Sequence, residues 1–395
     1  MHFTHFDNQR LLRQLSGQRF AVVYRLSGDE KTAREKANDI CAEQTVEFPV
    51  GLLPDGAIPE HVVGRIENFC QDDTRQDNKN SYLATISFAD ETAAGEFTQF
   101  LNVIFGNISM KFGIQVAGLH LSESIGKLLP GPQFGIQGIR KQLNIPKRPL
   151  LFTALKPMGL SAADLADLAG QFVHAGIDIV KDDHGLSDQI FSPFEERVQR
   201  CAAAVAEANA KLNRNAIYVP NITAPIDKIF DKVQRAKELG AGGVMISPGL
   251  AGLDTLRFLG ESKTGLPIIA HPAFIGSYIM NREQGIACGV LFGTLMRLAG
   301  ADATIFPNYG GRFPLTLDDC LDIVNASRCE LNEVKPIFPC PAGGMELKNI
   351  PDMLKHYGND MLVLVGSGLF RLGGSLLENG KRFQELLAGF EEELK

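Results

Sequence analysis

The sequence predicts an α/β fold in which a C-terminal (β/α)8 TIM barrel follows a small α+β, ferredoxin-like domain. The chain has 395 residues, more than one hydrophobic core usually serves. From Pro149 onward, short apolar runs alternate with helical stretches, which is the pattern of βαβ units in a parallel sheet. We therefore place an N-terminal domain at residues 1–122, a connector at 123–149 and the barrel at 150–395.

The N-terminal region mixes the two kinds of secondary-structure pattern. Residues 20–26 and 81–88 have the composition of strands, whereas residues 31–43 and 91–104 have helical periodicity. This order is typical of an α+β sandwich. Residues 123–149 are rich in glycine, proline and basic side chains, as expected for a connector.

The barrel is predicted from eight apolar runs, each followed by a helix-compatible stretch. The runs are 150–154, 177–181, 217–220, 244–247, 267–271, 303–307, 336–341 and 362–366. The alternative is an open, doubly wound sheet, which usually has fewer units and, when it binds dinucleotides, a GxGxxG after the first strand. No such element follows residues 150–154, so the closed barrel is favoured.

Composition limits the classes of binding partner and the cellular compartment that we expect for this protein. The formal net charge is −7 and basic residues form no dense stripe, so we expect no nucleic-acid partner. Seven cysteines, an odd number without a CxxC pair, indicate neither a disulfide framework nor a structural zinc site. No apolar stretch is long enough to span a bilayer, and no signal-peptide pattern is present. We therefore expect a cytoplasmic protein without membrane contact.

Polar residues crowd the carboxyl end of the second predicted strand, where barrels of this kind place their active sites. Lys181 and Asp183 alternate along the strand and so point the same way, into the mouth of the barrel, and His184 follows. A plain salt bridge is one interpretation. The other is carbamylation of Lys181 by CO2, which would create an anionic oxygen ligand and a site for Mg2+.

Glycine turns follow the seventh and eighth predicted strands. They consist of Gly343 and Gly344 in one turn, and Gly366, Ser367 and Gly368 in the other. Glycines let backbone N–H groups approach an oxyanion, and the helices that follow favour negative charge at their N-termini. The turns predict a binding site for one phosphate monoester, although tight βα turns would need the same residues.

Several of these segments resemble motifs of the RuBisCO superfamily, and the likeness covers most of the chain. They are the metal-site motif at 177–183, the first-strand motif at 155–161, the connector motif at 131–137 running on to 148–150, and Phe105, Gly106 and Asn107. The resemblance implies that Lys156 transfers protons near the enolisable carbon. It also implies that a carbamylated Lys181 binds Mg2+ together with Asp183 and His184, while the glycine turns hold phosphate.

The resemblance further implies a shared active site. Glu43 and Asn107, from the N-terminal domain of a second subunit, would complete the site of the first. We therefore expect a homodimer or a higher homo-oligomer, with a small phosphorylated molecule as the other partner.

The chain departs from carboxylating members of that family at positions that matter for chemistry. Pro272 follows His271 where carboxylases carry arginine, and Ile305 replaces a second phosphate-binding histidine. The other departures are Arg312 for the lysine of the sixth loop, Met158 for the second lysine of the first-strand motif, and His184 for glutamate. A second phosphate would be desolvated without a cation. These differences are typical of the non-carboxylating branch and predict a singly phosphorylated substrate.

Enolisation of a phosphorylated keto-sugar is the reaction that remains compatible with these departures. We expect an isomerase or enolase acting on a 5-methylthioribulose 1-phosphate-type substrate, or on the related 2,3-diketo-5-methylthiopentyl-1-phosphate. One alternative is decarboxylation of a β-keto sugar acid of the 3-oxo-isoapionate 4-phosphate type, in which Arg312 holds the departing carboxylate. Another is a non-catalytic sugar-phosphate-binding barrel, although the joint presence of Lys156, Lys181 and Asp183 favours catalysis. A zinc-dependent aldolase-like site has only His271 as a companion ligand for His184.

Overall fold

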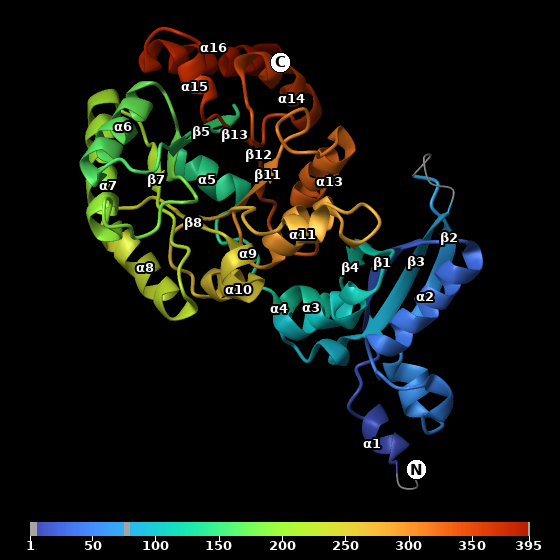
Figure 1. The fold of residues 1–395 in the computed structure, drawn as a ribbon. Coiled ribbons are helices and arrows are strands. Elements are labelled where there is room, and N and C mark those ends of the chain that lie inside the picture. Colours follow the sequence, from blue (N-terminus) through green and yellow to red (C-terminus); the bar gives the residue numbers. More distant parts are fainter. Residues whose placement is uncertain (1–5, 75–79, 394–395) are drawn as a thin grey trace. The chain divides into compact units, whose positions relative to one another are not determined.

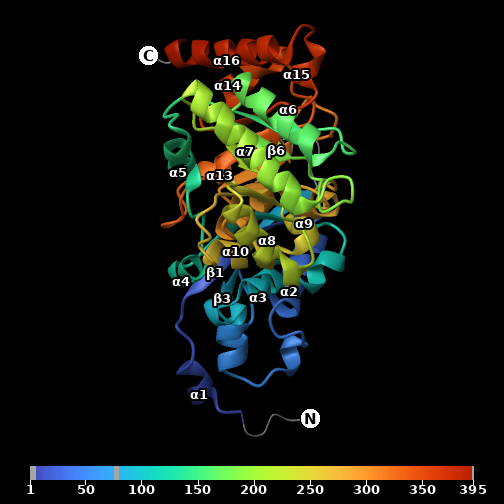
Figure 2. The ribbon, with the colours of Figure 1, turned by 90° about the vertical axis from the view of Figure 1, so that its left-hand side faces the viewer.

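The computed structural model describes residues 6–74 and 80–393, which form two compact units (Figures 1 and 2). The first unit comprises Met1–Leu129 and Gly276–Leu291, and the second comprises Pro130–Ile275 and Phe292–Lys395. Each unit has its own sheet system and its own core. None of the described helices is long and apolar enough to cross a membrane.

A five-stranded mixed sheet organises the first unit. Its order is β10-β4-β1-β3-β2, with β1 at Arg19–Ser27, β2 at Arg65–Gln71, β3 at Ser81–Ala89, β4 at Ile114–His120 and β10 at Gly285–Ile286. Strand β1 is antiparallel to both β3 and β4, and every second side chain along it is buried. The unit's helices are α1 (Asn8–Leu12), α2 (Glu30–Glu43), α3 (Phe97–Phe105), α4 (Glu123–Leu128) and α11 (Gly276–Ile279). Short 3-10 or π turns occur at Val50–Leu52, Ile58–Val62 and Asn107–Met110.

The helix expected at 91–104 is interrupted. A 3-10 turn at Asp90–Ala93 and helix α3 are separated by Ala94 and Gly95, whose φ angles are 51° and 70°. Positive φ is incompatible with a continuing right-handed helix. The expectation was therefore wrong over this junction, because periodicity alone does not reveal a backbone reversal.

Residues 276–291 belong to the first unit although they interrupt the barrel sequence. Gly285 and Ile286 pair in parallel with β4, and the Ala287 amide donates to the Val116 carbonyl. Gly285 has a φ of 105°, and a Cβ there would lie 2.1 Å from the Tyr278 carbonyl oxygen. Only glycine fits this crossing of two backbones.

The second unit is a (β/α)8 barrel, which confirms the predicted fold class. Its strands are β5 (Leu150–Leu155), β6 (Ile179–Asp182), β7 (Ile217–Val219), β8 (Val244–Ile246), β9 (Ile268–Ala270), β11 (Ala303–Pro307), β12 (Phe338–Ala342) and β13 (Leu362–Leu364). Each overlaps one of the eight expected runs. The ladders run β13-β5-β6-β7 and β8-β9-β11-β12, all parallel. Asn221 and Met245 bridge β7 to β8, and β12 packs beside β13.

Helices surround these strands (Figures 1 and 2). They are α6 (Ala162–His174), α7 (Phe194–Leu212), α8 (Ile226–Glu238), α9 (Pro248–Ala251), α10 (Leu253–Glu261), α12 (Met296–Leu298), α13 (Leu317–Arg328), α14 (Ile350–Tyr357), α15 (Gly368–Arg371) and α16 (Leu376–Glu393). A π-helical segment, Gly289–Leu295, precedes α12, and a 3-10 turn, Leu347–Asn349, precedes α14. Ser161 and Thr316 form capping boxes that fix where α6 and α13 begin.

The core of the barrel extends into the segment expected to be a connector. Helix α5 (Gly135–Leu143) contributes Ile136, Ile139 and Leu143 to the cluster of buried side chains inside the strands. The buried Asp302 carboxylate accepts the backbone N–H groups of Phe134 and Gly135 at 2.6 and 2.7 Å. These bonds satisfy amides at the start of α5 that have no partner within the helix.

Candidate active site

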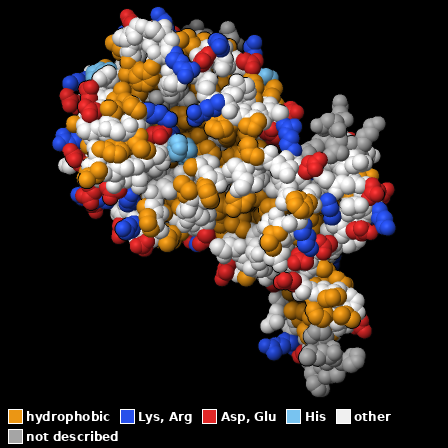
Figure 3. All heavy atoms as spheres, in the orientation of Figure 1, with side chains coloured by type: hydrophobic (Ala, Val, Ile, Leu, Met, Phe, Trp, Pro, Cys, Tyr) orange, Lys and Arg blue, Asp and Glu red, His pale blue; other side chains and the backbone are white. Residues whose placement is uncertain are grey.

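The predicted proton-transfer residue, Lys156, meets two of the predicted metal ligands, Asp183 and His184, at the carboxyl ends of β5 and β6. The two strands are neighbours, with Leu155 paired to Asp182, so the residues that follow them emerge together. Lys156 Nζ lies 2.8 Å from Asp183 Oδ1, and His184 Nδ1 lies 3.5 Å from the same oxygen. Figure 3 shows histidine and basic side chains close together on the visible face of the second unit.

Lys181 is buried beneath this pair. Its side chain is 2% exposed, and Nζ donates to the Asp182 carbonyl oxygen at 3.0 Å. Burial lowers the pKa of Lys181 to about 8, against the opposing effect of Asp183 and with help from the charge of Lys156. About a tenth of this amine is therefore neutral, and nucleophilic, at pH 7.

Asp183 remains ionised. Although burial opposes its charge, hydrogen bonds from His184 and Lys156 and the positive charges of Lys156 and Lys181 hold the pKa of the carboxyl well below its usual range. The carboxylate is thus a permanent anion at the centre of the cluster.

A second imidazole stacks on the first. The rings of His184 and His271 have centroids 4.5 Å apart and planes tilted by 13°. Burial lowers the pKa of His271 to about 2, and Lys181 and His184 add to the effect. Its Nδ1 accepts from the Ala273 amide at 3.2 Å, so the neutral ring carries its proton on Nε2. His271 is therefore available as a neutral hydrogen-bond donor.

A buried network behind the cluster fixes the end of β6. Asp182 is fully buried and accepts hydrogen bonds from Arg197 Nε at 3.1 Å, Tyr218 Oη at 2.6 Å and the Asn221 amide at 3.0 Å. The Asn221 side chain donates to the carbonyl oxygens of His184 and Leu186 at 2.9 and 2.8 Å. The direction of the loop that carries Asp183 and His184 is thereby set.

These supporting residues had no predicted role. One signal was present: Arg197 falls on the same face of α7 as Phe194 and Cys201, which are buried. A charged residue within a buried face needs a buried partner. Nothing in the sequence identified Asp182 as that partner.

The glycine turns come close to the loop that follows β11. Gly343 and Gly344 have φ angles of 91° and 103°, and a Cβ on Gly344 would lie 3.9 Å from the Arg312 backbone nitrogen. A Cβ on Gly311 would lie 2.2 Å from the Gly343 carbonyl oxygen. The structure thus places the Arg312 backbone beside one predicted phosphate turn, with the Arg312 side chain exposed.

The second turn has a different environment at each glycine. A Cβ on Gly366 would meet nothing within 4 Å, whereas one on Gly368 would lie 2.3 Å from the Met345 carbonyl oxygen. Ser367 between them is exposed. Gly368 is thus required by packing, whereas Gly366 borders open space.

Two positions where the sequence departs from carboxylases lie in different environments. Ile305 is 1% exposed and belongs to the core cluster of the barrel, so it does not line the mouth. Met158 is 49% exposed, and a Cβ on Gly185 would lie 2.5 Å from its Cε. Met158 is therefore the apolar side chain next to the loop of Asp183.

Glu43 and Asn107 lie together in the first unit. Asn107 Nδ2 donates to Glu43 Oε1 at 3.2 Å, and Lys111 Nζ approaches Glu43 Oε2 at 3.2 Å. Hydrogen bonds from Asn107 and Lys111 lower the pKa of Glu43. Glu43 is therefore an ionised carboxylate with the side-chain amide of Asn107 beside it.

The donors at the mouth of the barrel fit a divalent cation only if Lys181 is carbamylated. Among residues 6–74 and 80–393, no three His, Cys, Asp or Glu side chains gather closely enough to hold a metal ion. Asp183 and His184 supply two ligands, and only a carbamate on Lys181 would add a third, anionic one. An oxygen-rich set of that kind suits Mg2+; without the carbamate, Lys181 would repel the cation.

The fold and this cluster define the class of protein: a (β/α)8-barrel with a lysine-based site at the carboxyl ends of its first two strands. The family model of the ribulose bisphosphate carboxylase large chain, catalytic domain, matches residues 135–310. A solved RuBisCO-like protein from Rhodopseudomonas palustris is 34% identical, with a TM-score of 0.84, over 94% of this chain and 97% of that one. The chain belongs to the RuBisCO-like proteins.

Some relatives have names that state an isomerase or enolase activity. A 5-methylthioribulose-1-phosphate isomerase from Rhodospirillum rubrum is 32% identical over 94% of this chain and 96% of its own length. A 2,3-diketo-5-methylthiopentyl-1-phosphate enolase from Bacillus licheniformis is 30% identical over 91% of this chain and 88% of its own length. The predicted family resemblance is therefore confirmed.

Proposed function

We propose that this RuBisCO-like protein catalyses the Mg2+-dependent enolisation of a singly phosphorylated keto-sugar. The substrate we favour is of the 5-methylthioribulose 1-phosphate type, with isomerisation or enolisation as the net reaction. The observation that carries the proposal is the juxtaposition of Lys156, Asp183 and the buried amine of Lys181. The names of the two relatives support the substrate class.

Binding would begin at the glycine turns. Backbone amides around Gly344 and Gly366 would hold the phosphate. For a second phosphate, Pro272 stands where carboxylases carry arginine, and Ile305 is buried in the core of the barrel and supplies no cation to the mouth. The exposed Met158 would contact the apolar end of a methylthio-sugar. Bound in this way, the substrate would direct its carbonyl toward Lys156 and Asp183.

Proton transfer would then fall to Lys156. Its amine is 47% exposed and forms an ion pair with Asp183 at 2.8 Å. To act as the base it would have to leave that ion pair and lose its proton to solvent, which Mg2+ bound at Asp183 would favour. The neutral amine would then remove the proton from the carbon beside the carbonyl. Lys181, as the carbamate, would join Asp183 and His184 as ligands of Mg2+, whose Lewis acidity favours the enolate over the ketone. The neutral His271 would donate a hydrogen bond from Nε2 to an oxygen of the substrate.

Decarboxylation of a phosphorylated β-keto sugar acid is the second candidate. Arg312 favours it, because its backbone lies beside Gly344 and its side chain is exposed. A guanidinium at that place would bind a carboxylate through paired hydrogen bonds. The same enolate would then form by loss of CO2 rather than by loss of a proton.

One experiment separates these reactions. The purified protein is incubated in D2O with each class of substrate, with and without Mg2+ and bicarbonate, and deuterium incorporation and CO2 release are both measured. Exchange without CO2 release supports the isomerase or enolase. Release of CO2 from the keto acid supports the decarboxylase, and the absence of both reactions would leave only a binding protein.

Titration calorimetry tests the number of phosphates. A ketose monophosphate should bind more tightly than the matching bisphosphate, whose far phosphate would be desolvated without a partner. Tighter binding of the bisphosphate, lost in Arg312→Ala, would show that the sixth loop supplies a second phosphate site.

The oligomeric state is part of the proposal. We propose that Glu43 and Asn107 complete the barrel site of a second copy, in a homodimer or larger assembly. Met110 and Phe112, which flank Lys111, are 76% and 85% exposed, as expected for a surface that a second copy covers. Mixing inactive Glu43→Gln and Lys156→Met variants should restore activity in mixed oligomers, since one intact site would form. No recovery on subunit exchange would argue for sites made within one chain.

A further inference from the structure

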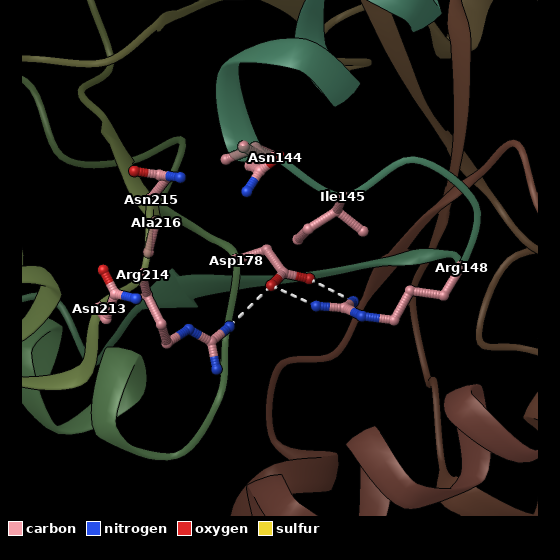
Figure 4. Close-up of a pocket in the computed structure, with 9 residues that line it drawn as sticks. Asn144, Ile145, Arg148, Asp178, Asn213, Arg214, Asn215 and Ala216 are labelled. Atoms are coloured by element: carbon pink, nitrogen blue, oxygen red, sulfur yellow. Dashed lines mark hydrogen bonds and ion pairs between the residues drawn. The ribbon is translucent and has the colours of Figure 1, made fainter.

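The barrel carries a polar pocket at the amino ends of its strands, opposite to the candidate active site. The pocket has a volume of about 190 Å³ and lies in the second unit between the end of α5, the start of β6 and the turn after α7 (Figure 4). Its lining residues are Leu143, Asn144, Ile145, Arg148, Asp178, Asn213, Arg214, Asn215 and Ala216. None of them belongs to the site described above.

Two arginines share one carboxylate in this pocket. Arg148 binds both oxygens of Asp178, with Nη1 and Nη2 at 2.7 and 2.8 Å, and Arg214 Nη2 binds Oδ1 at 2.8 Å. Asp178 is 1% exposed and is the only acid in the lining. The three groups therefore carry one excess positive charge.

Arg214 has hydrogen-bonding capacity to spare. Its Nη2 also donates to the Gly176 carbonyl oxygen at 2.8 Å, whereas Nε and Nη1 have no acceptor among the residues that the structure describes. Its side chain is 22% exposed. Burial and the nearby charge of Arg148 lower the pKa of Arg214, and Asp178 opposes them, as expected where positive charge is incompletely balanced.

Three amides border the same opening. The side chains of Asn144, Asn213 and Asn215 make no hydrogen bond to the described parts of the chain. Figure 4 shows them around the space into which the two arginines also project. Asn144 and Asn213 have φ angles of 57° and 51°, so each ends its helix in the left-handed conformation, and this reversal brings the side chain to the rim.

We propose that this pocket binds a tetrahedral oxyanion, with phosphate as the ligand class. A guanidinium with free N–H groups and amide donors is the combination that recognises such anions. The volume is below the 300–1,000 Å³ or so of ordinary ligand pockets, so the phosphate group itself would fill it. Both free inorganic phosphate and the phosphate of a small monoester fit this chemistry.

A purely structural role explains only part of the arrangement. Arg148 alone satisfies both oxygens of Asp178, which also accepts the Leu151 amide at 2.8 Å. A second guanidinium adds desolvation cost, and its Nε and Nη1 find no acceptor among the described residues. An anion beside Arg214 would accept hydrogen bonds from these groups.

The test is phosphate binding measured by equilibrium dialysis at constant ionic strength, with chloride as the filler salt. The pocket variants are Arg214→Gln and Asn213→Asp. Asn332→Asp is the matched control, because Asn332 is also exposed and has a φ of 46° but does not line the pocket. Removing the charged donor should weaken binding roughly tenfold or more. Asn213→Asp should weaken it by charge repulsion, and Asn332→Asp should not.

A variant at the glycine turns separates the two anion sites. Ser367→Asp should abolish binding at the turns and leave the pocket, so wild type should bind two phosphates and Ser367→Asp one. If Arg214→Gln and Asn213→Asp bind phosphate as wild type does, the pocket proposal is wrong. Glycerol phosphate in place of inorganic phosphate shows whether the ligand is the free ion or a monoester. Proton exchange with substrate is measured separately, so failure of the proposed enolisation would leave this result unaffected.

Discussion

The two ends of strand β6 hold the same kind of anion in opposite ways. At the amino end, Asp178 is bound by the guanidiniums of Arg148 and Arg214 and is 1% exposed. At the carboxyl end, Asp183 is bound by the amine of Lys156 and lies near the buried amine of Lys181. Guanidiniums stay charged at any physiological pH, whereas a buried amine can lose its proton and react. One end is therefore suited to a lasting ionic contact and the other to chemistry.

Replacing Lys181 should separate activity from stability most sharply. Lys181→Met should reduce Mg2+-dependent turnover to background, because it removes the group that we propose as the third metal ligand. The melting temperature should stay unchanged or rise, since an apolar group replaces a desolvated amine. Steady-state kinetics and thermal unfolding measure the two effects. Lys228→Met, at an exposed lysine of α8, is the control, and turnover retained by Lys181→Met would contradict the metal assignment.

Lys156→Met should have the next largest effect. Loss of a positioned acid/base group lowers the rate by a factor on the order of 10² to 10⁴. Substrate binding should be largely kept, because the glycine turns proposed to hold the phosphate do not include Lys156. Deuterium exchange under saturating substrate measures the rate. A variant that binds poorly yet exchanges normally once saturated would make Lys156 a binding residue.

Asp178→Asn should lower the stability of the protein, whereas Lys181→Met should lower its activity and leave its stability intact. The Asp178→Asn change leaves two guanidiniums beside a neutral amide, and we expect a loss of about 2–4 kcal/mol of unfolding free energy, discounted for their partial exposure. Denaturant unfolding measures it. Glu207→Gln, which removes an exposed pair with Lys211, should cause no measurable change. If Asp178→Asn and Glu207→Gln were equally stable, the ion pairs at the amino end of β6 would not have the stabilising role proposed for them.

The pH dependence of activation is the smallest predicted effect. Only the neutral amine of Lys181 can add CO2, and its pKa is about 8. The neutral fraction therefore rises with pH, by roughly tenfold from pH 7 to pH 9. The initial activity after preincubation with bicarbonate and Mg2+ should increase over this range. If activity did not depend on bicarbonate at any pH, Lys181 would act without carbamylation.

The sequence by itself determined the barrel and the composition of its mouth. Parallel strands buried on both sides are continuous apolar runs, so all eight could be located. Alternation along the second run then put Lys181 and Asp183 on one side, and the motifs around them indicated the family. These features are local, and short-range geometry is sufficient to derive them.

Tertiary structure decided what depends on contacts between distant segments. The sequence did not show that Gly285 and Ile286 would join the sheet of the first unit, because pairing with β4 leaves no mark on so short a strand. It also did not show that Asp182 would be held by Arg197 and Tyr218 from two other elements.

The pocket at the amino ends is the clearest case. Asp178 belongs to the recognised motif, but Arg148 and Arg214 lie 30 and 36 positions from it along the chain. Only the parallel pairing of β5, β6 and β7 side by side brings the two guanidiniums to one carboxylate. Local patterns specify which residues a strand presents, whereas the balance of charge around a buried group depends on every segment that packs against it.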